Sequence, residues 1–175
     1  MAAEILVRRL ATAGGEPRPA DLEALAAMME RTGRLHATFE PGFALVPGWE
    51  AMQRGWPRHV LADPDWYVAL ATVAGHAAGC LMATLEDAPP IYVLARRGFL
   101  SDVWVDEAWR RMGVTRTLVA AAEIWFRERG VSRVELSVAV ANAPGRETWR
   151  RLGYHPTTEH WARDLGPASP DAPRR

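Results

Sequence analysis

A predicted strand, a basic turn and the start of a helix follow one another in residues 102–115, which read DVWVDEAWRRMGVT. The apolar run 99–105 is typical of a strand, and it stops at Asp106. The turn that follows ends at Gly113, where a helical pattern begins. Backbone N–H groups at a helix N-terminus can point at a phosphate, and the helix dipole favours negative charge there. This stretch therefore predicts an anion site, with a solvated basic turn that caps a helix as the equal alternative.

Length and composition favour one ordinary globular domain. The 175-residue chain is 49% hydrophobic and 24% charged, and its formal net charge is zero. These values argue against wholesale disorder and against a global basic surface for nucleic acid or a membrane. A single cysteine excludes an internal disulfide, and the N-terminus shows no signal peptide. We expect one domain over residues 1–165, a disordered tail over 166–175, and a cytoplasmic monomer or homodimer.

Hydrophobic periodicity predicts a mixed α/β domain with its clearest helix directly after the basic turn. An N-cap at Asp21 and a stop at Gly33 are expected to bound the first helix. The other expected helices cover residues 49–54, 113–129 and 144–152. The expected strands cover residues 4–10, 65–73, 77–86, 98–105 and 133–140, and a further extended segment covers 154–165.

Two motifs resemble those of the GNAT acyltransferase superfamily. The strand that ends in V-x-V, followed by R-x-x-G with Arg110 and Gly113, resembles its acyl-coenzyme-A-binding motif. Residues 142–154 resemble its second motif, in which an Asn after a strand precedes a helix that ends in Gly-aromatic. The pair is fairly specific, whereas either motif alone is weak. The resemblance implies a central mixed, mostly antiparallel sheet flanked by helices, and acetyl transfer from acetyl-coenzyme A to a primary amine by direct attack.

The resemblance also implies where the coenzyme lies. Its pyrophosphate would rest on N–H groups of the turn, and its pantetheine arm would pair with the preceding strand as an added strand. Thr115 replaces the family's Gly or Ala, so its Cβ would crowd the pyrophosphate or its hydroxyl would donate to it. No metal is expected, because the histidines lack ligand spacing. The expected coenzyme-binding residues are Val103, Trp104, Val105, Arg110, Arg111, Met112, Gly113, Val114, Thr115 and Asn142.

Asp102 is the candidate catalytic base, because it interrupts an apolar run and burial would raise the pKa of its carboxyl group. A structural carboxylate is the alternative. The family's usual general acid is a Tyr seven residues after the Asn. Here that residue is Trp149, which has no proton to donate at useful pH. The acid is therefore left open between water, Tyr154 and no dedicated group.

The aromatic segment between the first helix and the next strand is the expected acceptor pocket, since aromatic rings and carboxylates suit a cationic amine. Hydrophobic plugs in an irregular segment are the alternative. Trp149 also keeps open a non-catalytic module that binds or senses acyl-coenzyme A. An open groove would instead suit a protein or peptide N-acetyltransferase. The expected acceptor-binding residues are Phe39, Glu40, Trp56 and Ser101.

Overall fold

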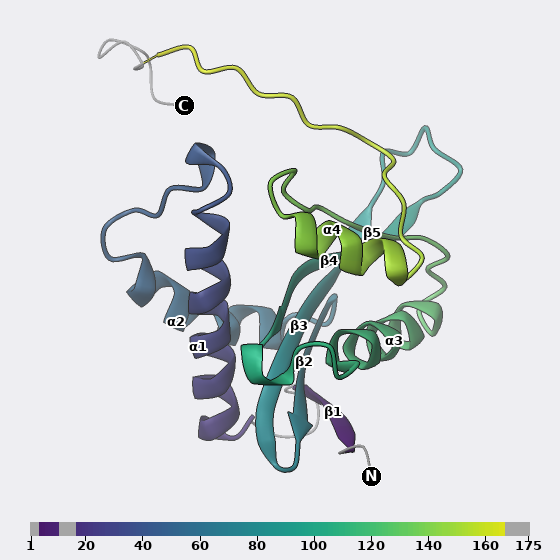
Figure 1. The fold of residues 1–175 in the computed structure, drawn as a ribbon. Coiled ribbons are helices and arrows are strands. Elements are labelled where there is room, and N and C mark those ends of the chain that lie inside the picture. The colour runs from purple at the N-terminus through teal and green to yellow at the C-terminus, as the bar shows by residue number, and fades with distance from the viewer. Residues whose placement is uncertain (1–3, 11–16, 167–175) are drawn as a thin grey trace.

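The computed structural model describes residues 4–10 and 17–166, apart from the side chains of residues 56–59. Short 3-10 helices, η1 (Pro41–Phe43) and η2 (Glu107–Trp109), interrupt two of the connections. The other elements are β1 (Ile5–Leu10), α1 (Pro19–His36), α2 (Trp49–Ala62), β2 (Trp66–Val73), β3 (His76–Asp87), β4 (Arg96–Val105), α3 (Val114–Arg127), β5 (Val134–Leu136) and α4 (Ala143–Arg151) (Figure 1).

The five strands form one sheet in the order β1-β2-β3-β4-β5. The first three pairings are antiparallel and the last, between β4 and β5, is parallel. Helices α1 and α2 lie on one side of the sheet and α3 lies on the other (Figure 1). The expected mixed, mostly antiparallel sheet with flanking helices is confirmed. No helix in the described ranges is long and apolar enough to cross a membrane.

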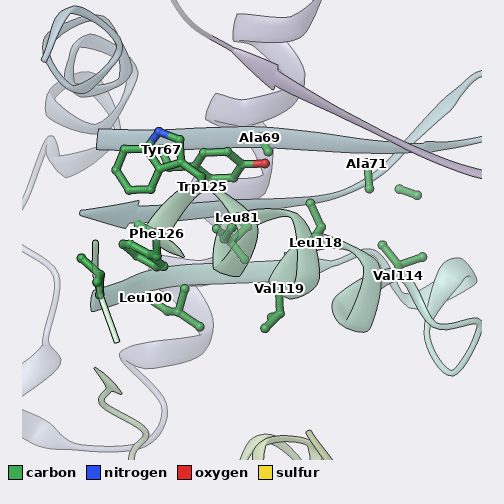
Figure 2. Close-up of a cluster of buried hydrophobic side chains, with 14 of the residues drawn as sticks. Tyr67, Ala69, Ala71, Leu81, Leu100, Val114, Leu118, Val119, Trp125 and Phe126 are labelled. Atoms are coloured by element: carbon green, nitrogen blue, oxygen red, sulfur yellow. The ribbon is translucent and has the colours of Figure 1, made fainter. Parts of the chain in front are cut away.

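The larger of the two hydrophobic cores lies between α3 and the sheet, because the apolar stripe of α3 repeats every three or four residues. Figure 2 shows Leu118, Trp125 and Phe126 of α3 against the strands. Gly98 of β4 is required at this contact, since a Cβ there would lie 2.6 Å from the Phe126 ring. The second core, on the α1 and α2 side, includes Leu25, Met28, Val68, Leu70, Cys80 and Met82.

A β-bulge in β4 decides which side of the sheet Asp102 faces. Met82 of β3 pairs with Asp102, but the next residue, Ala83, pairs with Leu100, so Ser101 is an extra residue. Leu100 packs in the core on the α3 side. Because side chains two apart share a face of an unbroken strand, Asp102 would otherwise point into that core. The bulge turns it toward α1 and α2 instead.

Helix α1 begins and ends outside its expected limits. Asp21 is not the N-cap, because the helix begins earlier with Arg18 in that position. Asp21 is instead buried and paired with Arg18 and with Arg8 of β1. Hydrogen bonds from these arginines lower the pKa of Asp21 to about 2. Gly33 does not stop the helix but packs against α2, where a Cβ would lie 3.0 Å from the Trp49 ring.

Three other predicted segments are also wrong in extent. Helix α2 continues well beyond residue 54, and β5 stops at Leu136 because β4 pairs with it only over residues 98–100. Residues 154–165 form no strand. The chain after α4 runs away from the sheet (Figure 1), and Trp161 and Leu165 are 88% and 86% exposed. Most of the expected disordered tail, residues 167–175, lies outside the described residues.

Candidate functional site

The turn after β4 presents a run of backbone N–H groups without partners. Arg111 and Gly113 have positive φ angles of 64° and 92°, and Gly113 is the N-cap of α3. Within the described part of the chain, the N–H groups of residues 111–116 donate no hydrogen bond. Successive N–H groups around left-handed residues form a concave anion site, which the dipole of α3 reinforces. This backbone is therefore a candidate anion site.

Side chains of this turn secure it to the end of β4. Arg110 donates a hydrogen bond to the Val105 carbonyl at 3.2 Å, and its guanidinium lies 5.6 Å from the Trp104 ring centre. The Trp104 indole N–H donates to Asp106 at 2.7 Å, on the side of α1. Val114 is buried in the core, so only its backbone faces the turn. The expected coenzyme residues of the turn therefore lie together, but several contribute backbone rather than side chain.

One edge of β4 is open next to this turn. Strand β5 pairs with β4 only over residues 98–100, so residues 101–105 have no neighbour on that side among the described strands. The Val103 and Val105 side chains pack against the core on the α3 side. An open strand edge can accept an extended molecule through main-chain hydrogen bonds. This edge of β4 is therefore a candidate site for the pantetheine arm that the family resemblance implies.

Asn142 forms the N-cap of α4. Its Oδ1 accepts a hydrogen bond from the Gly145 N–H at 3.0 Å, and a Cβ on Gly145 would lie 2.5 Å from Asn142 Nδ2. The Gly145 backbone is thus packed against the Asn142 amide. The cap does not use the Nδ2 donors, which could therefore bind a ligand.

A cavity of about 300 Å³ lies on the other side of β4, with Asp102 in its wall. Ser101 donates a hydrogen bond to the Asp102 carboxylate at 3.0 Å. Burial raises the pKa of Asp102, while this hydrogen bond and the nearby His36 act in the opposite direction. The expected partial burial of Asp102 is confirmed. The cavity is lined by Met29, Thr32, Gly33, His36, Met52, Gln53 and Asp102.

Phe39, Glu40 and Ser101 are not among the described residues that line this cavity. Glu40 is exposed and its carboxylate accepts a hydrogen bond from the Gly42 N–H at 3.2 Å, which caps η1. Phe39 reaches only the neighbourhood of the cavity, since its ring centre lies 6.3 Å from that of His36. Trp56 lies in α2, and its side chain is outside the described residues. Ser101 is the expected acceptor residue that adjoins the cavity, through Asp102.

Helix α1 supplies lining residues that were absent from the sequence-based set. Met29, Thr32, Gly33 and His36 recur at intervals of three and four, so they share one face of the helix. That spacing was visible in the sequence. A helix that stops at Gly33, as the sequence predicts, would leave His36 outside the helix and hide this spacing. Within the described ranges, no cluster of three or more His, Cys, Asp or Glu could hold a metal ion.

Tyr154 and Trp149 contact each other at the C-terminal end of α4. Their ring centres are 5.4 Å apart in an edge-to-face arrangement. The Tyr154 hydroxyl donates to Glu123 of α3 at 3.2 Å. Burial and the Glu123 carboxylate both raise the pKa of Tyr154, so its proton is held more tightly. This geometry favours packing over proton donation for Tyr154.

Sequence comparison gives a family match and a curated relative. The family model described as "Acetyltransferase (GNAT) family" matches residues 31–154. The L-amino acid N-acetyltransferase AaaT of Escherichia coli (strain K12) is 27% identical over 105 residues. That match covers 57% of this chain and 59% of AaaT, so it spans less than two thirds of the relative.

Solved structures share the fold at low sequence identity. A GCN5-related N-acetyltransferase from Ralstonia eutropha JMP134 has a TM-score of 0.71 at 23% identity, over 93% of this chain and all of that one. The aminoglycoside N-acetyltransferase AAC(6')-Iy in complex with CoA also has a TM-score of 0.71, at 17% identity, over 94% of this chain and 97% of that one.

Proposed function

This chain belongs to the acetyltransferase (GNAT) family, and on that premise we propose that it transfers the acetyl group of acetyl-coenzyme A to a primary amine of a small molecule. The arrangement around β4 is the observation that carries this proposal. A run of unpaired N–H groups follows β4, one edge of β4 is open, and Asp102 of β4 lines a cavity on the other side. Donor and acceptor sites thus adjoin the same short stretch of backbone.

Backbone groups of β4 and α3 are the proposed donor site. The N–H groups of residues 111–116 would hold the pyrophosphate, and the open edge of residues 101–105 would align the extended arm. Nδ2 of Asn142 would donate to the same arm. Acetyl-coenzyme A supplies the acetyl group as a thioester. Family membership and the CoA-bound structural relative support this donor.

Asp102 is the proposed base. An amine is cationic at neutral pH and must lose a proton before it can act as a nucleophile. The Asp102 carboxylate would hold the ammonium group by an ion pair and accept its proton, while the Ser101 hydroxyl orients the carboxylate. We assign no dedicated acid, because Trp149 has no suitable proton and the Tyr154 hydroxyl is committed to Glu123.

We expect Tyr154→Phe to separate packing from proton donation. The variant should keep kcat/KM within about threefold of the parent value, and lose about 1 kcal/mol of stability with its hydrogen bond to Glu123. Thiol release and urea unfolding would measure the two effects. Activity reduced at least about 100-fold with unchanged stability would instead make Tyr154 the general acid.

A thiol-release assay tests the proposed function directly. The protein and acetyl-coenzyme A would be incubated with a panel of small amines, and mass spectrometry would identify the N-acetylated product. We expect thiol release that depends on the amine and matches product formation. Acetyl-coenzyme A that binds in calorimetry, without turnover on any amine, would favour the non-catalytic acyl-coenzyme-A-binding module instead.

A further inference from the structure

The cavity at Asp102 is small and carries one fixed negative charge. Its volume of about 300 Å³ is at the lower end of the range for small-molecule sites. Among the described residues that line it, Asp102 is the only carboxylate and no arginine is present. A ligand there finds a partner for one ammonium group in Asp102, while a ligand carboxylate would lie beside a charge of its own sign.

Neighbouring arginines of α1 are already paired outside the cavity. Arg31 contacts the Asp106 carboxylate at 2.7 Å. Arg34 contacts Glu30 at 2.9 Å and Glu50 at 3.2 Å. These guanidinium groups therefore have carboxylate partners of their own, and neither is among the lining residues.

His36 is the lining side chain that could carry a positive charge. His36 and Asp102 both line the cavity, and the effect of burial on the pKa of Asp102 is opposed in part by the charge interaction with His36. A ligand carboxylate would have to compete with Asp102 for it.

The remaining described residues of the lining are apolar or neutral. Met29 is buried and Met52 is 68% exposed at the mouth, and their thioether side chains offer adaptable apolar surface. The Thr32 hydroxyl already donates to the Met28 carbonyl at 3.0 Å. Gln53 contributes a neutral amide. This lining suits an apolar body attached to a single ammonium group.

Resting on the proposed function, we infer that the acceptor is a small monoamine with an apolar body and without a carboxylate. An α-amino acid would bring its carboxylate into a site whose fixed charge is negative. A polyamine or aminoglycoside would bring several ammonium groups to one carboxylate. The inferred acceptor thus differs from the amino acids and aminoglycosides that appear in the names of two relatives.

Matched substrate pairs test this inference. 2-Phenylethylamine and phenylalanine differ only in the carboxylate, and pentylamine and 1,5-diaminopentane differ only in the second amine. We expect kcat/KM for each monoamine to exceed that of its partner, and that of kanamycin, by at least about tenfold. The chain contains no lysine, so its own side-chain amines do not compete for acetyl groups.

Equal or faster turnover of the amino acid, the diamine or kanamycin would overturn the inference and leave the acetyltransferase proposal intact. The absence of turnover with every amine would instead reject the proposed function.

A variant that adds a cation gives a second test. Gln53→Arg places a guanidinium in the lining, and we expect it to raise the phenylalanine to 2-phenylethylamine ratio of kcat/KM at least about tenfold. Ala51→Arg adds the same charge on an exposed position of α2 outside the lining and should leave that ratio unchanged. An unchanged ratio in Gln53→Arg, with acetyl-coenzyme A affinity retained as evidence of folding, would contradict the inference. An equal rise in both variants would show a general charge effect and would also contradict it.

Discussion

Asp102→Asn is expected to lower kcat/KM for any accepted amine by at least about 100-fold, while the affinity for acetyl-coenzyme A changes less than twofold. Asn has nearly the shape of Asp and can still accept a hydrogen bond from Ser101. It cannot pair with an ammonium group or accept its proton. The proposed donor site uses backbone groups and Nδ2 of Asn142, none of which the substitution removes, so it should be unaffected. Steady-state thiol release and calorimetry would measure the two effects.

The pH dependence of the parent protein gives an independent check on Asp102. Its carboxylate must be ionised to act, so kcat/KM should rise with pH through the pKa of Asp102. Burial raises that pKa, whereas Ser101 and His36 oppose the shift, so the rise should lie above the range of an ordinary carboxyl group. Asp102→Asn should lose this rise. If it persists in the variant, another group is the base.

Asp102→Asn should also stabilise the fold at neutral pH. The raised pKa means that the folded state holds the Asp102 proton more tightly than the unfolded state. The free energy of unfolding therefore falls as pH rises from the ordinary carboxyl pKa through the raised one, and stays lower above it. Removing the charge should therefore raise the free energy of unfolding at neutral pH, measured by urea unfolding. A destabilised variant would show that Asp102 is a structural carboxylate, the alternative that the sequence left open.

The sequence predicted those parts of the site that depend on local pattern. Apolar runs on either side of the turn at residues 74–75 predicted β2 and β3, and the stripe from Val114 to Trp125 predicted α3. Positive φ at Gly113 and Gly130 agrees with the predicted start and stop of that helix. Each of these signals depends on residues that are close together in the sequence, so it does not depend on contacts with distant parts of the chain.

Long-range contacts explain what the sequence did not predict. Gly33 continues α1 because the Trp49 ring fills the space beside it, and nothing near Gly33 in the chain indicates that. The extra residue at Ser101 is visible only once β3 and β4 are aligned, yet it decides that Asp102 faces the cavity. The apolar alternation continues beyond Leu136, but β4 no longer pairs there and β5 ends. In all three cases, contacts with residues distant in the sequence decided the structure and local preference did not.

Gly113→Ala is expected to weaken acetyl-coenzyme A binding by at least about tenfold. Space is not the reason, because a Cβ at Gly113 would come no closer than 3.8 Å to Ile5 Cδ1. The reason is the φ angle of 92°, which an alanine adopts only at a cost of about 1–2 kcal/mol. The turn should relax toward negative φ and redirect the N–H groups that are proposed to hold the pyrophosphate. Calorimetry with acetyl-coenzyme A would measure the loss.

Gly130→Ala is the matched control at the other end of α3. Gly130 also has a positive φ angle, 74°, and a Cβ there would meet nothing within 4 Å. Both variants should therefore lose about 1 kcal/mol of stability in urea unfolding from the same backbone strain. Only Gly113→Ala should lose affinity for acetyl-coenzyme A, since Gly130 lies at the end of α3 where carbonyl rather than N–H groups are exposed. If the two variants bind equally well or are weakened equally, the N–H groups at the start of α3 are not the coenzyme site.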